Sequence, residues 1–165
     1  MTARDARQIA RGDDEGEAVW LLGGLYRFRA AADETGAAYS LFQVDGHAGF
    51  AGPMHLHHEV AEGFYVVDGQ VTIFIGDQEI QATRGSFALA PPGVPHTFRF
   101  ESPEATLLLL IAPGDGEHEA LFREMGEPAM SRSIPPMPTG PPDVVELARI
   151  AARHGTQIVG PPPKS

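Results

Sequence analysis

Between residues 18 and 113, short apolar runs alternate with turn residues, a pattern that predicts strands rather than helices. Typical runs are GFYVV (63–67), QVTIFIG (70–76) and ATLLLLIA (105–112), with glycine-bearing turns such as VDGQ and TRGS between runs. The other expected strands are YRFRAA, AAYSLFQV, QEIQA, SFALA and TFRF. Short strands at this spacing are typical of an all-β sandwich or barrel.

The pattern changes after residue 113, where two helices and a proline-rich segment are expected. GDGEHEALFREMG has acids in its first turn and a glycine at its end, which indicates a helix over 114–126. PPDVVELARIAARHG (141–155) predicts a second helix, with one face formed by Val144, Leu147, Ile150 and Ala151. PAMSRSIPPMPTGPP between the two helices holds too many prolines for either element, and the tail TQIVGPPPKS is expected to be extended.

These patterns divide the chain into three parts. Residues 1–17 form a polar N-terminal segment that we expect to be frayed, residues 18–113 form the β-barrel, and residues 114–165 form a helical and proline-rich C-terminal extension. The two helices are too small for a domain of their own. We therefore expect them to pack on the outside of the barrel or on a partner subunit.

The composition narrows the chemistry that the chain can perform. Cysteine is absent, which excludes disulfides, thiolate metal sites and a cysteine nucleophile, so any metal must be held by histidine and carboxylate. The net charge is −10 and the 12 basic residues are dispersed, so nucleic acid is not an expected partner. The sequence shows neither a membrane span nor an apolar leader, and the expected location is the cytoplasm.

One short segment, 55-HLHHEVAE-62, holds three of the seven histidines. Side chains alternate along a strand, so His55 and His57 share one face and His58 takes the other. Two imidazoles so placed are suited to share a metal ion, and Glu62 returns beside them if the chain reverses after His58. Glu59, inside that turn, is a weaker candidate.

A further ligand is available from the loop 91-PPGVPH-96. His96 shares the apolar, inward face of its strand with Phe98 and Phe100. Taken separately, His96 and the His55/His57 pair each have an explanation that involves no metal. A single inward histidine is often a structural core residue, and an isolated His-x-His often arises by chance. The other histidines, expected at the surface, are His47, His58, His118 and His154.

The two histidine-bearing segments resemble the two signature motifs of the cupin superfamily. GFAGPMHLHHEVAEGFYVVDG (49–69) meets the first motif in full, and GSFALAPPGVPHTFRF (85–100) meets the second except that Phe100 stands where asparagine is usual. The resemblance covers about residues 22–113. It implies a jelly-roll-like β-barrel, or double-stranded β-helix, of two facing antiparallel sheets, and commonly a homodimer. It also implies that one divalent ion is bound by His55, His57, Glu62 and His96.

Within that superfamily the chain is most similar to single-domain, quercetin 2,3-dioxygenase-like bacterial proteins. The segments GPMHLHH, PPGVPHTFR, LFREMGEP and LARIAARHG carry this resemblance. It implies a flavonol- or enediol-like substrate that is chelated to the metal and attacked by O2. In that scheme Glu62 is both a ligand and the general base. The ligand types do not distinguish Fe, Mn, Ni, Co, Cu and Zn.

We expect the pocket around the ion to be apolar, although each of its residues is also a candidate for ordinary barrel core. The predicted lining is Tyr26, Phe28, Phe42, Met54, Phe64, Val66, Val71, Ile73, Phe98 and Phe100. Because Arg27, Arg29 and Arg99 are expected to face outward, a neutral aromatic or enolic substrate is favoured over an anionic one. Two alternatives stay open: a redox-neutral metal cupin (polyketide cyclase, isomerase or decarboxylase) and a small-molecule binding protein.

Overall fold

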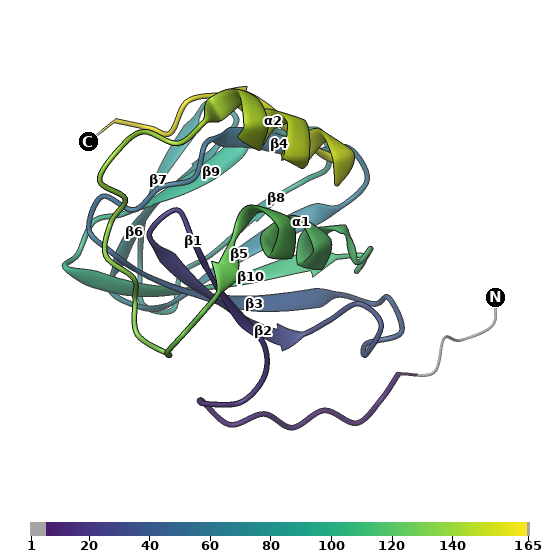
Figure 1. The fold of residues 1–165 in the computed structure, drawn as a ribbon. Helices are drawn as coiled ribbons and strands as arrows, with labels where there is room; N and C mark the ends of the chain where they lie inside the picture. The colour runs from purple at the N-terminus through teal and green to yellow at the C-terminus, as the bar shows by residue number, and fades with distance from the viewer. Residues whose placement is uncertain (1–5, 165) are drawn as a thin grey trace.

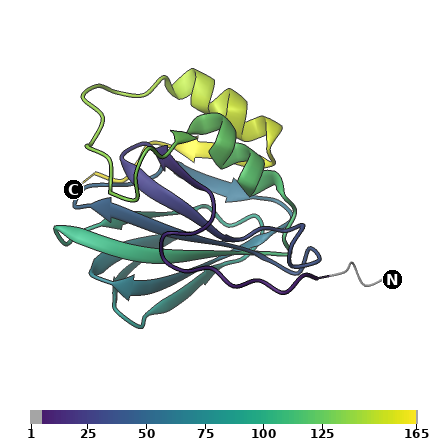
Figure 2. The same ribbon diagram turned by 60° about the horizontal axis from the view of Figure 1, so that its bottom comes forward.

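The structure is a computed structural model that describes residues 6–164, and its body consists of two facing antiparallel sheets (Figures 1 and 2). The larger sheet has the order β11-β1-β2-β3-β10-β5-β8 and the smaller one β12-β4-β9-β6-β7. The strands of the larger sheet are, in chain order, β1 (Ala18–Leu21), β2 (Gly24–Ala30), β3 (Ser40–His47), β5 (Ala61–Asp68), β8 (Phe87–Ala90), β10 (Glu104–Ala112) and β11 (Glu127–Pro128). Those of the smaller sheet are β4 (Met54–His57), β6 (Gln70–Ile75), β7 (Gln78–Thr83), β9 (His96–Phe100) and β12 (Thr156–Gly160). The fold is the expected β-barrel of two facing antiparallel sheets.

Alternation along the strands places the core between the sheets. In β10 every second residue from Ala105 to Ile111 is buried, and the residues between them are partly exposed. Facing side chains such as Phe42, Phe64 and Phe100 are fully buried. The tight turns that precede β6 and β8 use Gly69 and Gly85 with φ values of 82° and 88°. This conformation is open to glycine at little cost, as the sequence predicted.

Two helices, α1 (Glu117–Met125) and α2 (Val144–Arg153), lie side by side outside the sheets and cover one end of the barrel (Figures 1 and 2). Phe122 of α1 packs its ring 4.8 Å from the ring of Tyr26 and 4.9 Å from that of Phe42. The buried carboxylate of Glu119 accepts hydrogen bonds from the Ala32 N–H and the Ser40 hydroxyl. Helix α1 is therefore fixed to the barrel by both apolar and polar contacts.

The C-terminal tail is more than an extended segment, because it forms β12 and pairs with β4. Thr156 lies opposite His57 and Ile158 lies opposite His55 in this antiparallel register. The extension thus supplies the edge strand beside the segment that carries two of the candidate ligands. This pairing joins residues about a hundred positions apart, which local sequence pattern cannot predict.

The N-terminal segment helps to bury one arginine of the larger sheet. Arg27 does lie on the outer face of β2, but it is buried rather than exposed, because it hydrogen bonds to Asp45 at 2.7 Å and to Asp13 at 2.6 Å. Residues 6–17 run along this face, and Arg11 forms an ion pair with Glu34 there. Among the described residues none of the helices is long and apolar enough to cross a membrane.

Candidate metal centre

Three strands bring His55, His57, Glu62 and His96 together between the two sheets, at the end of the barrel that the helices cover. Each of the four offers one ligand atom, and these atoms lie within 4.8 Å of one another. His57, Glu62 and His96 are at most 4% exposed, and His55 is partly exposed. The four residues that the two sequence motifs indicate are thus one buried cluster.

The distances within the cluster suit a shared divalent ion. Glu62 Oε2 lies 3.0 Å from the Nε2 atoms of both His57 and His96, and 3.6 Å from His55 Nε2. Two donor atoms held about 2.1 Å from one ion at right angles are about 3.0 Å apart. Three imidazoles and one carboxylate are a usual donor set for a first-row ion with open coordination positions.

A second layer of contacts orients the three imidazoles. The Nδ1–H groups of His55 and His96 donate to the carbonyl oxygens of Pro53 and Val94 at 2.9 and 2.8 Å. His57 Nδ1 lies 3.2 Å from the hydroxyl oxygen of Thr156 on β12. These contacts leave the Nε2 lone pairs aimed at the centre of the cluster, the arrangement expected around metal-binding histidines.

The electrostatics of the cluster favour a charged carboxylate beside the imidazoles. Burial raises the pKa of Glu62, but the close polar contacts of its carboxylate with His55, His57 and His96 outweigh burial and hold that pKa well below its usual range. Burial lowers the pKa of His57 and keeps this ring neutral. Burial also opposes protonation of His96, yet contact with Glu62 raises its pKa. The ionised carboxylate and the neutral ring of His57 are the forms that bind a cation.

His118, which the sequence analysis assigned to the surface, is a component of this site. It is 3% exposed, and its Nε2 lies 3.3 Å from His57 Nε2. Its Nδ1 has no hydrogen-bond partner among the described residues, and Asp115 Oδ1 is 3.7 Å away. One signal was available in the sequence, because His118, Leu121, Phe122 and Met125 form a single stripe at helical spacing.

A small cavity of about 80 Å³ adjoins the donor atoms. Of the predicted pocket residues, Tyr26 and Phe98 line it. Burial raises the pKa of Tyr26, so its phenol stays protonated. The apolar positions that are instead buried core are Phe28, Phe42, Phe64, Val66, Val71, Ile73 and Phe100. Met54 points to the opposite face of β4 from the two histidines and lies near Gly160.

The remaining lining of this cavity was not predicted, and most of it comes from the helices, β12, and the end of β1 with the loop that follows it. It includes Leu21, Leu22, Pro53, Leu109, Leu121, Phe122, Met125, Ala151, Thr156 and Ile158. Arg27, Arg29 and Arg99 do not line it, in agreement with the expected lack of inward-facing cations. The cavity is therefore apolar except for the histidines, the carboxylate and the hydroxyls of Tyr26 and Thr156.

Comparison with known proteins agrees with this picture. A family model described as "Cupin domain" matches residues 42–112. Quercetin 2,3-dioxygenase of Bacillus subtilis is 31% identical over 124 residues, which are 74% of this chain and 36% of that protein. Quercetin 2,3-dioxygenase of Aspergillus japonicus is 28% identical over 135 residues, 78% of this chain and 38% of that protein. The chain thus spans little more than a third of the length of these two relatives.

Among solved structures, ectoine synthase from P. lautus is similar to this chain with a TM-score of 0.59. It is 17% identical, and the match covers 82% of this chain and 97% of that one. At this identity the likeness concerns the fold alone.

Proposed function

We propose that this chain of the cupin superfamily is a metal-dependent dioxygenase that acts on a small aromatic or enolic compound. The observation that carries this proposal is the buried cluster of three Nε2 atoms and one carboxylate beside an apolar cavity. The similarity to two quercetin 2,3-dioxygenases supports an oxygen-dependent reaction and a flavonol-like arrangement of substrate oxygens.

In the proposed site His55, His57, His96 and Glu62 hold one divalent transition metal ion, which would supply Lewis-acid binding for substrate oxygens and an electron path to O2. Thr156 and the carbonyls of Pro53 and Val94 keep the imidazoles oriented. The apolar walls, including Phe98 and Phe122, exclude water from the reacting groups.

Glu62 has a second proposed role, as the base that accepts the hydroxyl proton of the substrate. Its lowered pKa keeps it ionised and therefore able to accept a proton, but also makes it a weak base. The proposed substrate carries such a proton on the hydroxyl of an enol conjugated to a carbonyl. An uncharged substrate also suits a cavity that Arg27, Arg29 and Arg99 do not reach.

Oxygen uptake tests the proposed reaction. Apo-protein is reloaded separately with Fe(II), Mn(II), Co(II), Ni(II), Cu(II) and Zn(II) and mixed with quercetin or a single-ring enolic compound, with His57→Ala as the matched metal-deficient control. We expect uptake that matches substrate loss with at least one ion and none in the control. Product formation under argon would contradict this and indicate a redox-neutral metal cupin. Binding without any product would indicate a binding protein.

We also propose that the protein is a homodimer formed through the larger sheet. Its edge strand β8 and the neighbouring β5 expose apolar side chains outward: Phe87 is 59% exposed, Leu89 50% and Tyr65 43%. An exposed apolar edge strand is a ready surface for pairing with a second copy. Light scattering should give a dimer that Phe87→Glu dissociates and that Val145→Glu, an exposed valine on α2, leaves intact. A wild-type monomer would contradict the proposal.

A further inference from the structure

Helix α1 places one polar side chain in the inner cavity, the cavity of about 80 Å³ beside the donor atoms. This side chain is His118, which lines the cavity together with Leu121, Phe122 and Met125 of the same helix. His118 is 3% exposed, and the proposed function gives it no role. A buried histidine that lines such a cavity is a candidate for a functional contact.

Binding of the proposed ion removes the one hydrogen bond that the described residues offer to His118. Its Nε2 atom lies 3.3 Å from His57 Nε2, and this contact is a hydrogen bond only while one of the two atoms carries a proton. As a metal ligand, His57 keeps its proton on Nδ1, 3.2 Å from the Thr156 hydroxyl oxygen, and its Nε2 lone pair is taken by the ion. His118 Nε2 is then left without a partner within residues 6–164.

The other ring nitrogen of His118 faces Asp115. His118 Nδ1 is buried without a hydrogen-bond partner among the described residues, and Asp115 Oδ1 lies 3.7 Å away. The same oxygen accepts a hydrogen bond from the N–H of Glu117 at 2.9 Å, which holds the carboxylate at the start of α1. A carboxylate in this place favours the ring form with the proton on Nδ1. The Nε2 atom is then an acceptor on the side of His57 and the cavity.

This acceptor lies beside the metal centre and not within it. The four ligand atoms all lie within 4.8 Å of one another, and His118 does not belong to that group. A cavity of about 80 Å³ holds only a few atoms, so a molecule that enters it to reach the donors also meets His118. Because a buried acceptor without a partner is costly, such a molecule is stabilised if it donates a hydrogen bond there.

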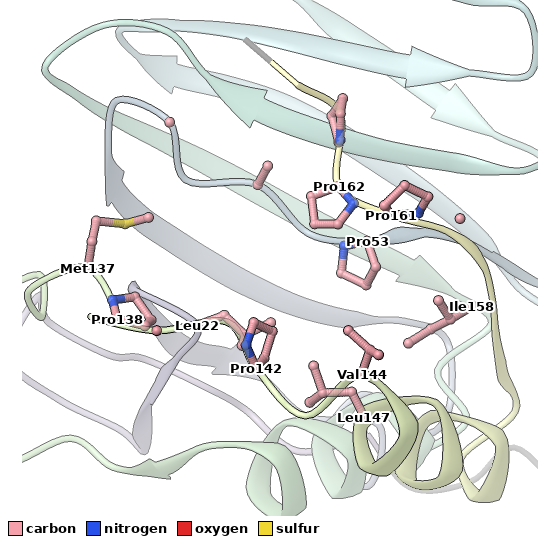
Figure 3. Close-up of a pocket in the computed structure, with 15 residues that line it drawn as sticks. Leu22, Pro53, Met137, Pro138, Pro142, Val144, Leu147, Ile158, Pro161 and Pro162 are labelled. Carbon is pink, nitrogen blue, oxygen red and sulfur yellow. The ribbon is translucent and has the colours of Figure 1, made fainter.

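A larger apolar cavity of about 530 Å³ offers a polar molecule no such contact. All of its lining residues are apolar or glycine, and most of them belong to the C-terminal extension (Figure 3). Leu22, Pro53 and Ile158 line both cavities and separate the larger one from the donor atoms. A small molecule with a hydroxyl group is therefore expected to bind in the inner cavity.

We propose that His118 is a substrate-binding residue whose Nε2 atom accepts a hydrogen bond from a hydroxyl group of the molecule bound in the inner cavity, while Asp115 holds the ring in the required orientation. This hydroxyl group keeps its proton and is distinct in role from the one that Glu62 deprotonates. The inference rests on the metal site of the proposed function but not on its reaction. It predicts that the site prefers a molecule with a free hydroxyl group over the corresponding methyl ether.

The test compares glycolate with methoxyacetate, two small carboxylates that differ only in a hydroxyl group and its methyl ether. Their Kd values are measured at one fixed pH under argon, from the visible absorption of the Co(II)-loaded protein. His118→Leu removes the acceptor, and His118→Gln keeps an acceptor oxygen on a side chain of similar length. The control is His47→Leu, the same exchange at a more exposed histidine that contacts the Pro103 carbonyl.

We expect wild-type protein to bind glycolate about tenfold more tightly than methoxyacetate. His118→Leu should raise the Kd of glycolate by about fivefold or more, and that of methoxyacetate by less than about twofold, because one hydrogen bond is lost. His118→Gln should keep most of the preference and His47→Leu all of it. Equal wild-type Kd values, a preference of unchanged size in His118→Leu, or a spectrum that neither ligand changes would overturn the proposal. Loss of Co(II) from His118→Leu would also overturn it, because His118 would then be a ligand.

Nuclear magnetic resonance of the Zn(II)-loaded protein reports on the hydrogen bond itself. Glycolate should shift the nitrogen signal of His118 Nε2, and methoxyacetate should shift it much less, because only glycolate carries a hydroxyl proton. A histidine with a purely structural role would respond equally to the two ligands. An equal response would therefore contradict the proposal even if His118→Leu lowered the affinity.

Failure of this inference can be distinguished from failure of the proposed function. A glycolate preference that depends on His118, without oxygen uptake by any metal-loaded form of the protein, would contradict the dioxygenase alone. Oxygen uptake by a protein whose glycolate preference does not depend on His118 would contradict the role of His118 alone.

Discussion

The metal centre and the larger apolar cavity, which lies between the C-terminal extension and the barrel and has a volume of about 530 Å³, are built in different ways. The centre takes its four donors from one segment of eight residues, 55–62, and from His96. The larger cavity takes its lining from segments that extend from Leu22 to Pro163, and most of that lining belongs to the C-terminal extension. The donors and the lining of the larger cavity therefore come largely from separate parts of the chain, and variants should be able to change one without the other.

The largest expected effect is loss of the metal. His96→Ala removes a donor that is buried at the middle of the cluster, so bound metal should fall from about one equivalent to less than about a tenth. The far-ultraviolet circular dichroism should stay that of the folded barrel. Elemental analysis of the purified variant gives the metal content. A full equivalent of metal in His96→Ala would show that the ion is held elsewhere.

Loss of packing at α1 is the next largest effect. Phe122 contacts the rings of Tyr26 and Phe42, and its replacement by alanine should lower the free energy of unfolding by about 3–5 kcal/mol. Urea denaturation measures this change. The four donors remain in Phe122→Ala, so the folded fraction should still bind one metal ion. A loss below about 1 kcal/mol would mean that α1 is not held on the barrel as described.

His118 contacts His57 but is not one of the four proposed metal ligands. We expect His118→Leu to keep one equivalent of metal and to change the metal affinity by no more than about tenfold, because the four proposed donors are untouched. Competition with a chromophoric chelator measures the affinity, and His57→Leu serves as the matched control that loses the metal. Loss of metal in both variants would make His118 a fifth ligand.

A smaller effect concerns the start of α2. The Asp143 carboxylate caps α2 by accepting from the N–H groups of Val145 and Glu146. Asp143→Ala should cost about 1 kcal/mol of stability and Asp143→Ser much less, because serine also caps helices. Denaturation curves of the two variants test this. Equal losses in both would contradict a capping role.

The smallest effect is a pH dependence where the two helices meet. His154 hydrogen bonds to Glu124 and Glu117, and the contact with Glu124 raises its pKa above the ordinary value of 6.5. The stabilisation by this contact is therefore complete below pH 6.5 and is lost as the pH rises through the raised pKa. The ring signals of His154 in NMR should titrate above 6.5, and less so in Glu124→Gln. An identical midpoint in both proteins would contradict the contact.

The metal centre could be predicted because strand alternation and short spacings determine it. His55 and His57 share a face through their separation of two, and His96 follows a proline-stiffened loop. The pocket could not be predicted in the same way. Alternation places Phe42 and Tyr26 alike on an inward face, but only packing decides that Phe42 is core and Tyr26 lines the cavity. The role of Thr156 depends on β12 pairing across about a hundred residues, which no local pattern encodes.

The proposed function requires one divalent ion held by His55, His57, Glu62 and His96. Crystals of the protein loaded with Co(II) or Zn(II), measured at the absorption edge of the metal, would locate the ion through its anomalous signal. We predict one site, with the Nε2 atoms of the three histidines and a Glu62 oxygen about 2.0–2.2 Å from the ion. An anomalous peak away from these four residues, or no peak between the sheets, would contradict the proposed metal site.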